Sequence, residues 1–280
     1  MSYATQKLDR FLDSIYIKHG PYDLLARFFL KAATLVAERG VYLEFSSFAK
    51  LIEVNAANVD SWRPITQSFH PDQGGVNDDC GLVILGRDAA GDVVATQAIR
   101  VFQWPTSSFK TEAEALRVFY ADPQRDRQPG EACVVTAPNA EDITNVVALG
   151  GGVWYRPDFR RFRLGEIIPR IARAYAYALW DVDNIVATFS EANVTKGFHR
   201  RVGFRDLSRW VTLHNSPSYP GSVVRMTLGR QQPQDIIDDT FAFLMNFDAA
   251  DPAHLSESVS VEQALAKRGD TARSRRALSH

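Results

Sequence analysis

The feature that most constrains this sequence is a strand-like segment that runs into a helix through an arginine-rich turn. Residues 145–155 (NVVALGGGVWY) are largely apolar and β-branched, and residues 166–180 (EIIPRIARAYAYALW) carry apolar residues at helical spacing. The turn between them holds four arginines: Arg156, Arg160, Arg161 and Arg163. A strand that feeds a helix in this way predicts an α/β fold.

Two helices are predicted before the first strand. Apolar residues recur at helical spacing through residues 6–39, Pro21 suits a helix start, and Gly40 suits a helix stop. Residues 41–46 (VYLEFS) have the composition of a short strand. We therefore expect residues 1–40 to form an N-terminal helical extension.

A hairpin and several alternating elements follow. The β-branched runs 80–88 and 92–104 are joined by a short turn in which Gly91 can take a positive φ. Further along, residues 194–203 (VTKGFHRRVG) are expected to form one short helix. The order of strands and helices from residue 41 on predicts a mixed, mostly antiparallel central sheet flanked by helices.

The remaining segments set the expected domain organisation. We expect one domain over 41–248, interrupted by an insert at 105–142 that has less regular patterning. From residue 249 the chain is polar, which predicts a mobile tail over 249–280.

Charge and composition exclude several classes of protein. The net charge is −1, so binding of nucleic acid through overall charge is not expected. The most apolar N-terminal run, 28–36, is too short and too charged to span a membrane. Cys80, Cys133 and the histidines show no metal-ligand spacing, so no metal site is expected. These features indicate a soluble cytoplasmic protein with no nucleic-acid or membrane partner.

The arginine-rich turn is a candidate anion site. Helix N-termini present unpaired amides and a positive dipole end, and arginine adds charge-assisted contacts to phosphate. Residues 156–209 hold eleven basic and six acidic side chains, although the whole chain is slightly acidic. This asymmetry indicates an anionic ligand. The alternative is a solvated arginine cluster paired with Asp158 and Glu166.

Two motifs in this region resemble those of the GNAT acyltransferases. The stretch YRPDFRRFRLG resembles the family's acetyl-CoA-binding motif, and SEANVTKGFHRRVGF resembles the strand end and short helix that follow it in the family. The matching positions are Pro157, Phe159, Arg160, Gly165, Phe198, Gly203 and Phe204, with Asn193 one residue from the expected asparagine. Arg163 stands at the family's first glycine, Arg161 at a small residue, and His199 at its tyrosine. The two arginines would either crowd the pyrophosphate or reach it as cations.

The resemblance implies a GNAT-like fold with extra N-terminal helices, and an acyltransferase that moves an acetyl or longer acyl group from coenzyme A to an amine. The group transferred is one other than an aminoacyl group, and acetyl-CoA or another acyl-CoA is the co-substrate. His199 would protonate the leaving thiolate. The residues implied in binding the co-substrate are Val153, Tyr155, Arg160, Arg161, Phe162, Arg163, Leu164, Gly165 and Asn193.

Several roles stay open at this point. Glycines 150–152 permit a β-bulge and close approach of a ligand, or simply tight packing. Asn193 either contacts the co-substrate or caps a helix that starts at Val194. The candidates for the general base are Glu131, Glu191, His70 or a water relay. The candidates for the acceptor side are Trp62, Phe69 and His70.

Other functions are compatible with the sequence. The fold could serve as a non-catalytic module that binds a phosphorylated metabolite or coenzyme A, or as a scaffold protein. If the chain is an enzyme, the acceptor is a small-molecule or peptide amine: an amino acid, an aminoglycoside, a polyamine or a protein amine. The N-terminal helices and the 105–142 insert would cover the acceptor cleft, lengthen an acyl pocket or form a homodimer contact.

Overall fold

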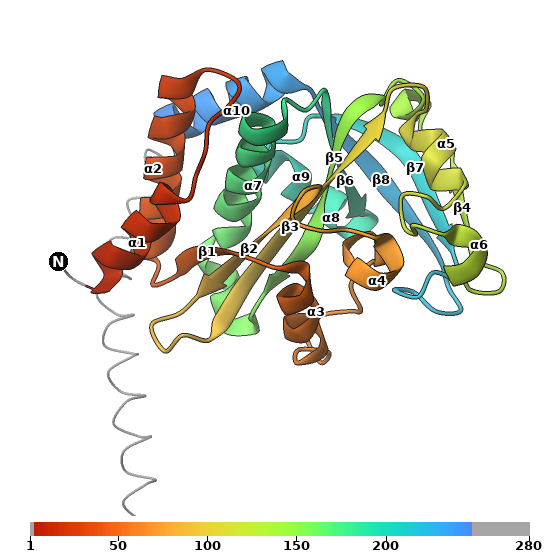
Figure 1. Cartoon of the computed structure of the whole chain (residues 1–280), viewed down its shortest axis with the longest axis horizontal. Helices are drawn as coiled ribbons and strands as arrows, with labels where there is room; N and C mark the ends of the chain where they lie inside the picture. The colour runs from red at the N-terminus through yellow and green to blue at the C-terminus, as the bar shows by residue number, and fades with distance from the viewer. Residues whose placement is uncertain (1–2, 248–280) are drawn as a thin grey trace, which may run out of the picture. The chain divides into compact units, whose positions relative to one another are not determined.

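A computed structural model of the chain, which describes residues 3–247, contains one eight-stranded sheet (Figure 1). The strand order is β1-β2-β3-β5-β6-β8-β7-β4, and every neighbouring pair is antiparallel except β5 with β6. The strands are β1 (Tyr42–Ser46), β2 (Gly81–Arg87), β3 (Val93–Trp104), β4 (Ala132–Val135), β5 (Asn145–Tyr155), β6 (Asn184–Ser190), β7 (Asp206–His214) and β8 (Val223–Gln231). The predicted mixed, mostly antiparallel sheet is confirmed.

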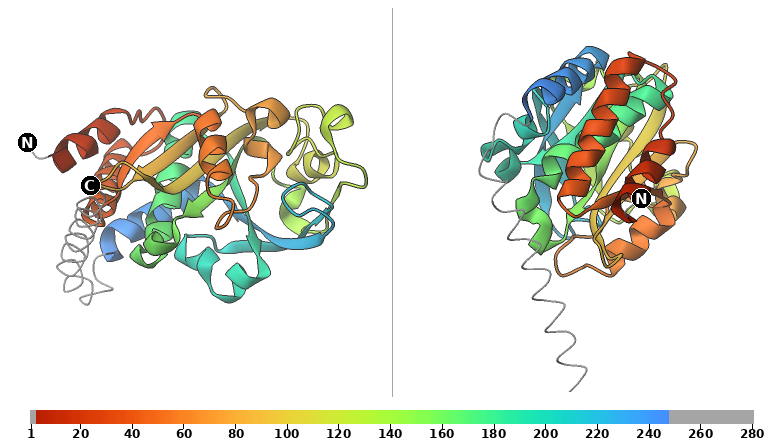
Figure 2. Two further views of the ribbon diagram at one scale, coloured as in Figure 1. Left: turned by 90° about the horizontal axis from the view of Figure 1, so that it is seen from below. Right: turned by 90° about the vertical axis from the view of Figure 1, so that its left-hand side faces the viewer.

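Helices cover both faces of this sheet. The α-helices are α1 (Tyr3–Asp13), α2 (Tyr22–Glu38), α3 (Phe48–Ala56), α4 (Pro71–Gly74), α5 (Phe109–Glu114), α6 (Pro123–Asp126), α7 (Leu164–Trp180), α8 (Glu191–Thr195), α9 (Phe198–Arg201) and α10 (Pro233–Asn246). The short 3₁₀ helices are η1 (Gln67–Phe69), η2 (Pro138–Ala140) and η3 (Pro157–Phe162). Helix α7 packs on β3 and β5 and against α2, whereas α3 and α4 lie on the other side of the sheet (Figures 1 and 2).

Local sequence signals explain several of these elements. The two N-terminal helices and the hairpin of β2 and β3 form as predicted, with Gly91 at φ 91° in the hairpin turn. Ser47 caps α3, because its side chain accepts a hydrogen bond from the Lys50 amide. The compact unit that carries the sheet ends at Phe241.

The insert at 105–142 extends the sheet. It supplies α5, α6 and β4, and β4 pairs with β7 from Ala132↔His214 to Val135↔Val211. The eighth strand of the sheet therefore comes from the insert. The predicted tail, 249–280, lies outside the described residues.

One local prediction was wrong. Residues 194–203 do not form one helix, because Gly197 takes φ 67° and separates α8 from α9. The segment 63–79, between α3 and β2, contains η1 and α4. Within residues 3–247, no helix has both the length and the apolar character needed to cross a membrane.

Candidate active site

The sheet splits between its two parallel strands. Strands β5 and β6 pair only from Val147↔Asn184 to Leu149↔Val186, although both continue beyond that point. Each stays paired with its outer neighbour, β5 with β3 as far as Tyr155 and β6 with β8 as far as Ser190. The two halves of the sheet therefore diverge, and a cavity of about 1010 Å³ lies along the opening.

A β-bulge shapes the wall of this cavity on β5. The register with β3 shifts between Thr96 and Ala98, and Gly152 takes φ 59°. The Thr96 hydroxyl donates to the Gly152 carbonyl at 2.7 Å, and the Gln97 amide donates to the Gly151 carbonyl at 3.1 Å. A bulge, one of the alternatives left open for glycines 150–152, is present, and side chains of β3 hold it in place.

The turn after β5 brings the start of α7 to the cavity. Helix η3 leads into Arg163, which takes the left-handed conformation at φ 55° immediately before α7 begins. A Cβ atom on Gly165 would lie 3.3 Å from the Tyr155 ring and 3.4 Å from the Phe198 ring. A glycine at this position therefore lets the first turn of α7 pack closely against β5 and α9.

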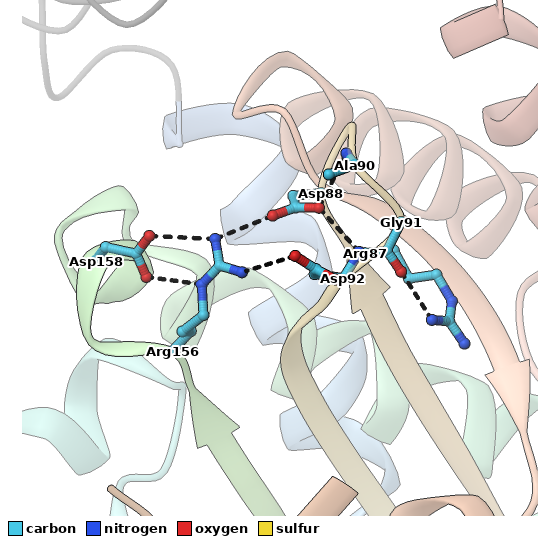
Figure 3. Close-up of polar contacts among 7 residues, drawn as sticks. All are labelled: Arg87, Asp88, Ala90, Gly91, Asp92, Arg156 and Asp158. Carbon is cyan, nitrogen blue, oxygen red and sulfur yellow. Dashed lines mark hydrogen bonds and ion pairs between the residues drawn. The ribbon is translucent and has the colours of Figure 1, made fainter. Parts of the chain in front are cut away.

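Arg156 is directed to a different cluster of charges. Its guanidinium lies 2.9 Å from Asp158, 3.0 Å from Asp88 and 3.8 Å from Asp92 (Figure 3). Asp88 and Asp92 belong to the β2–β3 turn, so this arginine ties that turn to the end of β5. Arg156 does not line the cavity.

The other three arginines of the turn differ in their positions. Arg160 lines the cavity, and its guanidinium donates to the backbone carbonyls of Tyr155 at 3.1 Å and Ser61 at 3.2 Å. Arg163 also lines the cavity and lies 2.8 Å from the Glu166 carboxylate. Arg161 does not line the cavity, and its guanidinium stacks 5.1 Å from the Phe162 ring.

The structure brings together most of the predicted co-substrate residues. The cavity walls include six of the nine: Val153, Tyr155, Arg160, Arg163, Gly165 and Asn193. The three that do not line it are Arg161, Phe162 and Leu164. Asn193 is not a helix cap, because α8 begins at Glu191. The cap is Ser190, whose side-chain oxygen accepts a hydrogen bond from the backbone N–H of Asn193.

The cavity is strongly basic. Its lining cations are Arg63, Arg160, Arg163, Arg173, Lys196 and Arg201. Among the described residues that line it, Glu166 is the only acidic one, and it is paired with Arg163. Such a set of side chains favours an anionic ligand. The described residues contain no group of three or more side chains placed to hold a metal ion.

Arg173 is buried at this cavity, which the half-buried Tyr155, with its buried hydroxyl oxygen, also lines. The Arg173 guanidinium donates to the Val202 carbonyl and lies 3.6 Å from Asp239. Burial lowers the pKa of Arg173 to about 10, so the guanidinium is charged at neutral pH. Burial raises the pKa of the Tyr155 hydroxyl, which therefore stays protonated.

Three buried polar atoms on the cavity wall have no hydrogen-bond partner within the described chain. They are Gln97 Oε1, Tyr155 Oη and Ser218 Oγ. Leaving a buried polar atom unpaired costs about 1–3 kcal/mol. Polar atoms of this kind at a cavity wall are suited to hydrogen bonds with a ligand.

His199 lies next to the cavity but does not line it. The side chain is buried in α9, and its ring centroid is 6.4 Å from that of Phe189, which is part of the wall. Burial lowers the pKa of His199, so the imidazole is neutral at pH 7. Its Nδ1 has no partner among the described residues.

The candidate general bases lie away from the cavity wall. Glu131 accepts hydrogen bonds from the Tyr120 hydroxyl at 2.7 Å and from the Gln128 amide, and Glu191 lies 3.9 Å from Arg209. Neither Glu131, Glu191 nor His70 lines the cavity. Proton transfer through water therefore fits the wall better than direct transfer to one of these side chains.

Two of the three candidates for the acceptor side line the cavity, and sequence reasoning missed other lining residues. Trp62 and Phe69 line the cavity, whereas His70 does not. The residues that were missed include Arg63 in the loop after α3, Phe119 in the insert and Tyr219 in the β7–β8 connection. These three come from separate loops, and no periodic pattern marks them.

Comparisons with known proteins give likenesses at the level of structure. No protein-family model matches this sequence, and the search of curated proteins found none similar to it. One similar structure is an aminoglycoside acetyltransferase in complex with coenzyme A and kanamycin, at 13% identity and TM-score 0.39, over 70% of this chain and 96% of that chain. Another is a mutant form of a spermidine/spermine N-acetyltransferase from Vibrio cholerae, at 7% identity and TM-score 0.42. This likeness covers 71% of this chain and 97% of that chain. Since both TM-scores are below 0.5, we argue function from this chain's own residues.

Proposed function

We propose that this protein is a GNAT-type N-acyltransferase that moves an acetyl or longer acyl group from coenzyme A to an amine. One observation carries the proposal: a single cavity connects the basic turn before α7 with the bulge on β5, along the split between β5 and β6. An anion-binding end and a bulged strand within one cavity are suited to a phosphorylated thioester and its reacting carbonyl.

The donor would lie along the basic wall. Arg160 and Arg163 line the cavity from the turn before α7, a helix of 17 residues, and Lys196 and Arg201 line it from the end of α8 and from α9; we call these four residues the basic wall. The positive end of the helix dipole adds to these charges, so the phosphates of coenzyme A would be held there. The pantetheine arm would then run toward Gly152, past the residues of β5 and α8 that line the split.

In the proposed reaction the acceptor amine attacks the thioester directly, with no acyl-enzyme intermediate. The lone pair of a neutral amine forms a C–N bond to the thioester carbonyl carbon, and the oxygen carries the negative charge of the tetrahedral intermediate. Backbone amides at the bulge on β5 would stabilise that oxyanion. The C–S bond then breaks, and the sulfur leaves with the electron pair. The amine nitrogen gives one proton to water, and the thiolate gains one, which yields an amide and free coenzyme A.

His199 is our candidate donor of the thiolate proton, acting from behind the cavity wall. The ring would first take up a proton from water, because only the imidazolium form is acidic enough to protonate a thiolate, and it would return to the neutral form after giving that proton to the sulfur. The role would show as a fall in kcat for His199→Ala with little change in the affinity for acetyl-CoA. An unchanged kcat would remove His199 from the mechanism.

A second candidate function is a non-catalytic module that binds coenzyme A or a phosphorylated metabolite. The observation that favours it is the position of the candidate proton-transfer groups, since His199, Glu131, Glu191 and His70 all lie off the cavity wall. The two functions differ in turnover. Tight binding of acetyl-CoA without thiol release in the presence of any amine would favour the module.

Calorimetric titration with acetyl-CoA tests the donor site. We expect the parent to bind, and Arg160→Ala to bind about tenfold or more weakly, because a charge-assisted contact is lost. Arg156→Ala is the matched control, because Arg156 belongs to the same turn but pairs with carboxylates outside the cavity. If the parent binds neither acetyl-CoA nor longer acyl-CoAs, the proposed function is wrong.

A further inference from the structure

The cavity wall also has an aromatic and apolar portion. Trp62, Phe119 and Tyr219 are partly buried against the core cluster, and Phe69 and Met226 belong to that cluster. We call the space bounded by these five residues the apolar chamber. Aromatic side chains of this kind favour a ligand with a flat or bulky apolar body.

The chamber has no group that would bind a polycation. Within residues 3–247, the only acidic side chain on the whole cavity wall is Glu166, and Arg163 neutralises it at 2.8 Å. An acceptor with several positive charges would meet six cations and no free carboxylate. Like charges in one cavity repel, so a polyamine or an aminoglycoside fits poorly.

Arg63 is a cation beside this chamber that has no anionic partner. Its guanidinium lies 5.0 Å from the centre of the Tyr219 ring, and it makes no ion pair within the described chain. The backbone of its loop is fixed, because Asn55 Nδ2 donates to the Arg63 carbonyl at 2.9 Å and Asn55 Oδ1 accepts from the Ile65 amide at 3.1 Å. The guanidinium therefore starts from a fixed loop and rests on an aromatic face.

A second polar group faces the same region. Ser218 is 5% exposed, lines the cavity, and has a hydroxyl with no partner in the described chain. It directly precedes Tyr219, on whose ring Arg63 stacks. An arginine and a hydroxyl together form a common donor set for a carboxylate.

From these observations, and resting on the proposed function, we infer that the acceptor is an amine that carries a carboxylate and an aromatic or large apolar group. An aromatic α-amino acid is the simplest molecule of this class. The chamber takes its side chain, Arg63 and the Ser218 hydroxyl bind its carboxylate, and its amine points toward the bulge on β5. The amine attacks the thioester as described above, with the same proton balance.

Matched pairs of acceptors test this inference. The initial rate of thiol release from acetyl-CoA is measured for two pairs: phenylalanine with phenethylamine, and tryptophan with tryptamine. In each pair the second compound lacks only the carboxylate of the first. We expect kcat/KM to be about tenfold or more higher for the amino acid of each pair, as one charge-assisted contact gives. Higher kcat/KM for spermidine or kanamycin than for the amino acids would overturn the inference.

Substitutions at Arg63 separate recognition of the carboxylate from structural effects. Arg63→Gln should raise KM for the amino acid about tenfold and leave KM for acetyl-CoA unchanged, and Arg63→Lys should recover part of the loss. Arg63→Glu should reverse the preference within each pair, which a merely structural role would not do. Arg127→Gln is the matched control, since Arg127 is exposed and does not line the cavity.

The outcomes also separate this inference from the proposed function. If neither acetyl-CoA nor a longer acyl-CoA binds, the proposed function fails, and the inference fails with it. If acetyl-CoA binds but no aromatic amino acid is acylated, only the acceptor class is overturned. A rise in KM for acetyl-CoA in Arg63→Gln would assign Arg63 to the donor and overturn the inference as well.

Discussion

Gly152 shows how much depends on a single backbone position. It takes φ 59° at the bulge, and a Cβ atom there would lie 2.9 Å from the Cβ of Ala98 on the neighbouring strand. An alanine would be strained both by its own backbone conformation and by that contact. The bulge that shapes the cavity wall therefore requires glycine at this residue.

We expect Gly152→Ala to lower the free energy of unfolding by about 1–3 kcal/mol and to reduce acyl transfer. Gly150→Ala is the control on the same strand, because the nearest atoms to a Cβ there are 3.7 and 3.8 Å away, an ordinary contact distance. Denaturant unfolding of both variants measures the difference. Equal losses of stability would mean that the bulge does not need glycine at 152.

Arg163 occupies the conformation that glycine prefers. The GNAT resemblance predicts glycine at this position, and the structure gives the reason, because the residue before α7 takes φ 55°. An arginine there carries a backbone cost of about 1–2 kcal/mol. Its ion pair with Glu166, in the first turn of α7, offsets part of that cost.

His199 should make stability depend on pH. Burial lowers its pKa below the ordinary value of 6.5, so the unfolded chain takes up a proton at a higher pH than the folded chain. The stabilising effect of the neutral imidazole is therefore complete above pH 6.5 and is lost as the pH falls below it. Between about pH 7.5 and about pH 5.5, the melting temperature of the parent should fall more than that of His199→Phe, which cannot titrate. An equal fall in the melting temperature of the parent and of His199→Phe would refute the titration of His199 as the cause.

At the scale of elements, an ion-pair cluster joins α7 to the first part of α10. Asp239 lies 2.9 Å from Arg170 and 3.6 Å from Arg173, and Arg173 is buried at the cavity wall. Gly203, at φ 95°, lies close to the same carboxylate, because a Cβ atom there would meet Asp239 Oδ2 at 2.4 Å. Asp239 therefore holds α7, α10 and the turn after α9 together beside the cavity.

We expect Asp239→Ala to destabilise the fold by about 3 kcal/mol, because it leaves the buried Arg173 cation without its carboxylate partner. Asp238→Ala is the matched control, since Asp238 is exposed on the same helix and, within residues 3–247, accepts only a hydrogen bond from Gln234. Thermal unfolding of the two variants checks this. If Asp238→Ala costs as much as Asp239→Ala, the cluster does not stabilise the fold.

At the scale of the whole molecule, the sequence predicted what local signals determine. The hairpin of β2 and β3 follows from β-branched runs around Gly91, and α7 follows from its apolar spacing. The glycine run left a bulge on β5 open as one alternative, and the GNAT resemblance named nine co-substrate residues, of which six line the cavity.

Contacts between distant segments could not be predicted in this way. The pairing of β4 with β7 joins the insert to the end of the sheet, and Arg156 finds two of its partners, Asp88 and Asp92, in a distant hairpin turn. Arg63 and Tyr219 meet across more than half of the chain. No periodicity within a segment encodes which other segment it will contact, so such parts of the site need the structure.

A crystal structure of the protein with acetyl-CoA tests the central claim most directly. We predict that pyrophosphate oxygens lie within hydrogen-bonding distance of the first backbone amides of α7, and that the thioester carbonyl lies beside the bulge at Gly152 and Val153. The pantetheine arm should pass through the split between β5 and β6. Coenzyme A bound at another surface, with the Arg163 side chain filling the space before α7, would contradict the claim.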